Sequence, residues 1–171
     1  MSNKYNDYEN TVREYLRNYN YFKIMIANLE EDKTDQLNLL SQCSVSIAKY
    51  GDSTGGGSSE LNQTEAAASQ RMKIEENIRR IELNINELNT VINKIERALS
   101  AVGTLEKTAI SMYYFERKSW EDVGLEIDCT GKTARAKANR AIQDMTFMIF
   151  GAVARPTKQL SFCFFKFAPC G

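Results

Sequence analysis

The feature that most constrains this chain is an unbroken apolar repeat in its middle. From residue 74 to residue 102, apolar side chains recur at alternating steps of four and three residues, with charged residues between them. This spacing is typical of a coiled-coil helix, whose apolar stripe packs against another helix. The pattern predicts a helix over about residues 64–102. Its stripe is formed by Ile74, Ile78, Ile81, Ile85, Leu88, Ile92, Ile95 and Leu99.

A similar repeat lies nearer the N-terminus. Apolar residues recur at the same steps from Tyr8 to Leu29, which predicts a helix over about residues 6–48. Lys33 and Gln36 fall where the repeat requires apolar side chains, so we expect looser packing in the second half of this helix. Its tyrosines follow the repeat, which favours packing over stacking on nucleic-acid bases.

Residues 51–59 separate the two predicted helices and contain four glycines together with serine, threonine and aspartate. This composition favours a flexible loop, because glycine loses much backbone entropy when it is ordered. Two long helices joined by such a loop predict an antiparallel hairpin over residues 1–102. Leu83 and Val91 lie beside the stripe and make it wider than one helix covers. We therefore expect the eight stripe residues to support a homodimer or the docking of a partner.

The segment of residues 103–150 is expected to form a separate small domain. Gly103 lies where the long helix should end, and Thr104 can cap a short third helix. Ser119 and Asp122 have the spacing of a capping box, which predicts the start of a fourth helix.

A break between the last two helices is predicted at residues 128–130. Asp128 can adopt the left-handed backbone conformation that ends a helix, and Thr130 can cap the next one, expected over about residues 131–149. That helix contains four cations and no acidic residue before Asp144. The net charge of the whole chain does not reveal this local excess of positive charge, because its 22 Lys and Arg residues balance 22 Asp and Glu residues.

The last predicted helix also separates small side chains from long ones. At 100° per residue, a narrow inward stripe is formed by Ala134, Ala138, Ala141 and Met145. Long donors spread over the other side, while the alanines let the helix lie close to its neighbour. A solvated cationic face on a packing helix is one interpretation. The short capped helix before it favours the other, the recognition helix of a helix-turn-helix.

Nine residues are expected to form a DNA-binding surface. Thr130 would donate to a phosphate at the helix N-terminus, and Lys132 and Arg140 would hold the DNA backbone. Arg135 and Asn139 would read base edges. The complete set is Thr130, Lys132, Thr133, Arg135, Ala136, Lys137, Asn139, Arg140 and Gln143.

Short motifs in residues 104–145 carry a family resemblance. They are Ser119-Trp120-Glu121-Asp122-Val123, Thr130 with Thr133, and Arg140-Ala141-Ile142. These motifs resemble region 4 of sigma-70-type factors. The wider layout, with its opening Tyr15–Tyr19, a glycine-rich break and a heptad helix, is similar to phage-encoded activators of the RinA and ArpU type. The resemblance implies a transcription activator of phage or prophage genes, which binds double-stranded promoter DNA and contacts host RNA polymerase.

Four positions depart from the family pattern. Asp128 replaces the turn glycine, Ala134 a valine, Lys137 an apolar residue and Gly124 an alanine. Lys137 falls at the edge of the inward stripe, where its stem can pack while its ammonium reaches solvent. The small Gly124 suits close contact between helices. The fold is compatible with these changes, but the base preference can differ from that of the family.

Catalysis and metal binding are not expected. The chain has no histidine, which is the commonest general base and metal ligand. The cysteines form no Cys-x-x-Cys pair, so we expect reduced thiols and no zinc at Cys43, Cys129, Cys163 and Cys170. No apolar run approaches the roughly 18 residues of a membrane helix, and the polar N-terminus has no secretory signal. We expect a cytoplasmic protein without cofactor, outside the membrane.

Residues 151–171 are expected to form a non-helical, poorly ordered tail. The aromatic run within it could instead pair as an edge strand or cover an apolar patch. It consists of Phe162, Phe164, Phe165 and Phe167.

The main alternative function is a protein-interaction adaptor or anti-sigma-type factor that works through its coiled coil. The acidic residues of the fourth predicted helix, Glu121, Asp122 and Glu126, are compatible with protein docking. The salt dependence of duplex binding discriminates between the two functions, because phosphate contacts release counterions.

Overall fold

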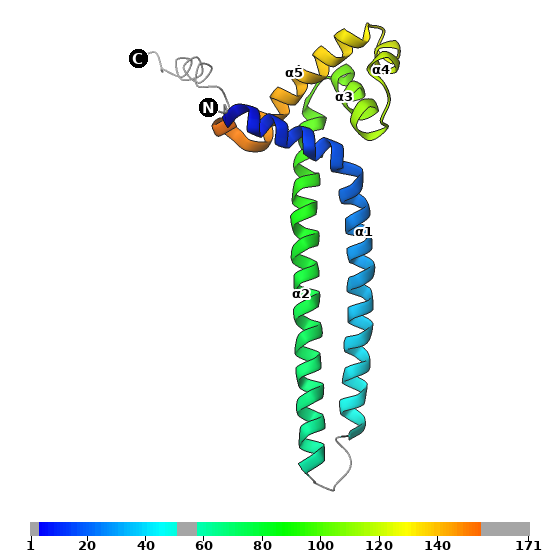
Figure 1. Cartoon of the computed structure of the whole chain (residues 1–171), viewed down its shortest axis with the longest axis vertical. Helices are drawn as coiled ribbons and strands as arrows, with labels where there is room; N and C mark the ends of the chain where they lie inside the picture. Colours follow the sequence, from blue (N-terminus) through cyan, green and yellow to red (C-terminus); the bar gives the residue numbers. More distant parts are fainter. Residues whose placement is uncertain (1–3, 51–57, 155–171) are drawn as a thin grey trace, which may run out of the picture. The chain divides into compact units, whose positions relative to one another are not determined.

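The computed structural model describes residues 4–50 and 58–154, and every element in these ranges is helical (Figure 1). The predicted all-α class is confirmed. In chain order the elements are α1 (Lys4–Tyr50), α2 (Ser58–Ala101), α3 (Thr104–Ile110), the π-helical η1 (Ser111–Phe115), α4 (Trp120–Glu126), α5 (Gly131–Phe150) and the 3-10 helix η2 (Gly151–Ala154). Within the described ranges, none of these helices has the length and apolar character needed to cross a membrane.

Both long helices extend beyond their predicted ends. Residues 58 and 59, which we expected in the flexible loop, belong to the first turn of α2. The rest of the predicted loop, residues 51–57, lies outside the described residues.

The chain divides into two compact units. Unit 1 combines residues 1–21 with residues 91–171, and unit 2 comprises residues 22–90. This division differs from the predicted one, in which residues 1–102 formed a hairpin and residues 103–150 a separate domain. The reason is the burial of Val12 and Leu16, which are fully enclosed in one core with the side chains of α3, α4 and α5.

In unit 2, the two helical segments run side by side in opposite directions (Figure 1). An ion pair of 2.7 Å joins Lys33 Nζ of α1 to Glu82 Oε1 of α2. Lys33, which interrupts the apolar repeat, therefore forms an ion pair between the two helices. The stripe residues of this unit are buried or half-buried within the single chain, while Leu83 is 56% exposed.

In unit 1, the last part of α2 packs into the common core. Ile92, Ile95 and Leu99, which we expected to mediate oligomerisation, are buried within one chain. Ile95 is fully enclosed together with Ile110, Val123, Ile142 and Met145. Their burial needs no second copy, because α1 and the short helices already cover them.

The start of α3 differs from the prediction. Gly103 is the N-cap of α3 and has an extended backbone with φ −61° and ψ 156°, so it does not end α2 in a left-handed conformation. Thr104 is the first helical residue and not the cap. The predicted third helix also changes form near its end, because residues 111–115 adopt the wider π-helical turn of η1.

The beginning of the predicted non-helical tail is helical. Gly151, with a left-handed φ of 72°, ends α5, and residues 151–154 continue as a 3-10 turn in which Ala154 is fully buried. The burial of Ala154 explains why the chain stays ordered past the glycine. Residues 155–171, including the four phenylalanines, lie outside the described residues.

Candidate nucleic-acid interface

The predicted capping box at the start of α4 is confirmed. The Asp122 backbone N–H donates to the Ser119 hydroxyl at 3.2 Å, and the Ser119 backbone N–H donates to Asp122 Oδ2 at 3.4 Å. This reciprocal pair satisfies two free donors of the first turn. It fixes the direction in which α4 leaves the loop.

The turn between α4 and α5 also follows the sequence prediction. Asp128 has a φ of 52°, the left-handed conformation expected there. The Cys129 N–H donates to the Gly124 carbonyl at 2.8 Å and closes the end of α4. Thr130 then caps α5, because its hydroxyl accepts from the Thr133 N–H at 3.2 Å.

Two glycines allow the backbones of α4 and α5 to meet. A Cβ atom on Gly124 would lie 2.6 Å from the Cys129 carbonyl oxygen. A Cβ atom on Gly131 would lie 2.9 Å from the Trp120 carbonyl oxygen. Both separations are shorter than a carbon-oxygen contact allows, so the predicted close contact at Gly124 is confirmed.

The inward stripe of α5 is confirmed as well. Ala134 and Ala138 are fully buried, and Ala141 and Met145 are at most 2% exposed. The small alanines let α5 pack closely on α3 and α4, whose Ile110 and Val123 belong to the same core. The packing determines which side of α5 remains outside.

Most of the nine predicted DNA-binding residues lie on the surface. The first turn of α5 carries no acidic side chain, so the cations Lys132 and Arg135 are exposed near the positive end of the helix dipole without a neighbouring carboxylate on that turn. The exposed members of the set are Thr130, Lys132, Thr133, Arg135, Ala136, Arg140 and Gln143.

The other two members are engaged within unit 1. Lys137 is half-buried, and its ammonium lies 3.8 Å from Glu106 Oε1 of α3. Asn139 is half-buried, and its Oδ1 accepts from Arg13 Nη1 of α1 at 3.3 Å. Adenine recognition by asparagine needs this oxygen as an acceptor, so the structure does not present Asn139 as the free base-reading side chain that we expected.

Arg13 is the functional candidate that the sequence did not reveal. Its guanidinium also donates to Tyr114 Oη at 3.3 Å and to Glu9 Oε1 at 2.5 Å. Burial acts to lower the pKa of Arg13, but the hydrogen bond to Glu9 and the contacts with Tyr114 outweigh it and raise the pKa. Arg13 lies 126 residues from Asn139 in sequence, so no local pattern links the two residues.

Aromatic contacts hold α1 against the rest of unit 1. Tyr8 and Tyr15 pack on Phe150, with ring centroids 5.0 Å and 6.5 Å away, and Tyr19 stacks on Phe115 at 4.4 Å. The expectation that these tyrosines pack is confirmed. The first part of α1 is therefore an integral part of the unit that contains α5.

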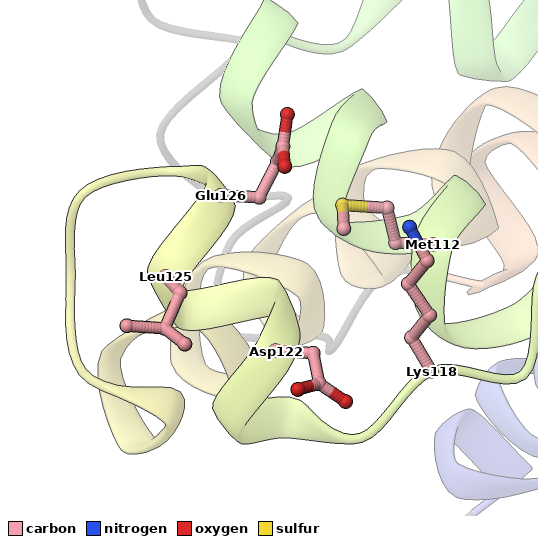
Figure 2. A pocket seen from close by; sticks show the side chains of 5 residues that line it. All are labelled: Met112, Lys118, Asp122, Leu125 and Glu126. Atoms are coloured by element: carbon pink, nitrogen blue, oxygen red, sulfur yellow. The ribbon is translucent and has the colours of Figure 1, made fainter.

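The outer face of α4 has the opposite charge. A hollow of about 440 Å³ is lined by Met112, Lys118, Asp122, Leu125 and Glu126 (Figure 2). Figure 2 shows the Asp122 and Glu126 carboxylates pointing in different directions, and Leu125 is 78% exposed. The hydrogen bond from Lys118 to Glu116 raises the pKa of Lys118. Phosphate is disfavoured on this acidic face.

In the described part of the chain, no group of three or more Cys, Asp or Glu residues could hold a metal ion. Comparisons with protein-family models, curated proteins and solved structures find no match to this chain. The assignment of function therefore depends on the chemistry of α4, α5 and the residues around them.

Proposed function

We propose that this chain is a sequence-specific DNA-binding transcription regulator. In this proposal α4, the turn at residues 127–130 and α5 act as a helix-turn-helix, and the N-terminal half of α5 enters the major groove. The observation that supports it best is the exposed surface of that half. Lys132 and Arg135 lie there beside the capped helix N-terminus, and no acidic residue lies in the first turn.

Four of the exposed side chains have a chemical role in this proposal. The Thr130 hydroxyl and the first N–H groups of α5 bind one phosphate, while Lys132 and Arg140 neutralise phosphates on the DNA backbone. Arg135 donates two hydrogen bonds to guanine. The acidic face of α4 is directed away from the phosphates, because like charges repel.

The test is retention of genomic and prophage DNA fragments by the purified chain at near-physiological salt. Wild type should retain a few upstream regions, and a Lys132→Ala, Arg135→Ala, Arg140→Ala variant should lose them. A matched control removes three exposed cations elsewhere in unit 1, with Lys94→Ala, Arg97→Ala and Lys107→Ala. Equal retention by all three proteins would contradict the proposal.

The resemblance to RinA- and ArpU-type proteins extends the proposal to activation of phage or prophage genes. The regulator would work in the cytoplasm, on promoter DNA, together with host RNA polymerase. A reporter gene placed behind a retained fragment tests the direction of regulation. Increased transcription that depends on Arg135 supports an activator, whereas decreased transcription identifies a repressor.

A protein-interaction adaptor or anti-sigma-type factor is the second candidate, and the hollow on α4 favours it. Leu125 is exposed and lines this hollow together with the carboxylates of Asp122 and Glu126, which suits a basic protein segment with an apolar anchor. A homodimer is compatible with either proposal. Leu83, the exposed apolar residue beside the stripe, would lie in its interface. Duplex binding that does not weaken as salt rises would favour the adaptor.

A further inference from the structure

A single guanidinium connects three helical segments of unit 1. Arg13 in α1 bonds to Tyr114 in η1 and to Asn139 in α5. We infer that Arg13 is a positioning residue for base recognition, which acts through Asn139 on the part of α5 that carries Arg135. The inference rests on the proposed DNA-binding function, and it adds α1 to the elements that determine selectivity.

The surroundings of Arg13 hold its guanidinium in one place. Tyr114 is only 4% exposed, so its hydroxyl is a fixed acceptor. Glu9 lies one turn earlier on α1 and accepts from the second terminal nitrogen, Nη2. The planar guanidinium has its donors in a rigid fork, so these two bonds also define where the donor to Asn139 points.

The bond to Asn139 does more than balance charge. Glu9 already supplies the negative partner within α1, so a neutral amide on α5 adds no further neutralisation. What it adds is a connection between segments that are 126 residues apart.

That connection constrains the rotation of α5. Asn139 and Arg135 are four residues apart and therefore lie one above the other on the same face of the helix. Fixing Asn139 consequently fixes the rotation of the turn that carries Arg135. Recognition geometry has to be held within about 0.5 Å and roughly 10–20°.

This arrangement predicts a separation between selectivity and general affinity. Loss of the Arg13–Asn139 bond should make the orientation of Arg135 less well defined but leave all phosphate contacts in place. A direct phosphate contact by Arg13 would act in the opposite way, because it would contribute to the salt dependence and not to selectivity.

The experiment selects bound sequences from a pool of randomised DNA duplexes, using the full chain. The variants are Arg13→Ala, Arg13→Lys, Asn139→Ala and the double Arg13→Ala, Asn139→Ala. Arg17→Ala, one turn further along α1 with an exposed side chain, is the matched control. Binding to the selected duplex and to an unselected duplex is then measured across a range of salt concentrations, and thermal unfolding confirms that each variant is folded.

We expect each single variant at Arg13 or Asn139 to lower the ratio of the affinity for the selected duplex to the affinity for the unselected duplex by about tenfold. The double variant should lose no more, the salt slope should not change, and Arg17→Ala should behave as wild type. Arg13→Lys keeps the charge without the fork, so its loss separates positioning from electrostatics. If Arg13→Ala does not fold, Arg13→Lys and Asn139→Ala together provide the test, because direct base reading by Asn139 predicts a loss only in Asn139→Ala, whereas positioning by Arg13 predicts a loss in both.

Three results would overturn the inference. Unchanged selectivity in Asn139→Ala and Arg13→Lys excludes positioning. A salt slope reduced by about one with unchanged selectivity makes Arg13 a phosphate contact. Selection of no sequence by wild type contradicts the proposed function as well, whereas the first two results leave that function standing.

Discussion

Gly124 of α4 faces the first residue of α5 so closely that a Cβ atom on Gly124 would lie 2.7 Å from the backbone nitrogen of Gly131. Backbone atoms cannot withdraw as a flexible side chain can. Even a methyl group at this position must therefore push α4 away from α5, which carries the candidate DNA-binding surface.

We expect Gly124→Ala to lower the free energy of unfolding by about 1–3 kcal/mol, the range measured for overpacked cores. Chemical denaturation measures the change. Leu125→Ala, in the same helix but 78% exposed, is the control and should have little effect. A Gly124→Ala protein as stable as wild type would show that the two backbones can separate at low cost.

The left-handed backbone at Asp128 gives a second prediction. A β-branched side chain is strained at its φ of 52°, so Asp128→Val should lower the unfolding free energy by about 1–2 kcal/mol, and Asp128→Gly should not. Asp144→Val is the matched control, because Asp144 is an exposed aspartate inside α5. Equal stability of the glycine and valine variants at position 128 would argue against the turn geometry.

The two lysines of the candidate surface should differ in their effect on DNA binding. Lys132 is exposed, whereas the Lys137 ammonium lies near Glu106. In the proposed function, Lys132→Ala should reduce the salt slope by about one and weaken binding to all sequences alike. Lys137→Ala should change the slope less, since its charge is partly compensated. Binding isotherms at several salt concentrations measure both slopes. A larger effect of Lys137→Ala than of Lys132→Ala would indicate that Lys137, and not Lys132, contacts a phosphate.

Local signals in the sequence account for the elements around the candidate surface. The capping side chains of Ser119 and Thr130, the left-handed Asp128 and the inward alanines of α5 all act over a few residues, and all were predictable. The unit boundaries were not, because they depend on where Val12 and Leu16 are buried, and the apolar repeat that contains Val12 continues without a break into unit 2.

The bond between Arg13 and Asn139 was not predictable for a similar reason. On an isolated helix its amide belongs to the polar face, and the sequence contains no sign that Arg13 occupies it. The π-helical turn of η1 was also missed, because every residue from Met112 to Phe115 is apolar or aromatic and the sequence does not show where the helical register changes.

Arg135 gives the most direct prediction of the proposed function. Its side chain is exposed in the second turn of α5, near the capped N-terminus and away from the aromatic contacts that hold α1. Arg135→Ala should cost about 1–3 kcal/mol in binding to the preferred sequence and relax selectivity at one position, because a bidentate contact to guanine is lost. Lys132→Ala is the comparison, as it should weaken preferred and unrelated duplexes equally. Competition binding with a set of single-base variants of the preferred duplex measures both effects. If Arg135→Ala discriminates among the variants as wild type does, the base-reading residue lies elsewhere on α5, and Ala136 and Gln143 are the exposed candidates to replace next.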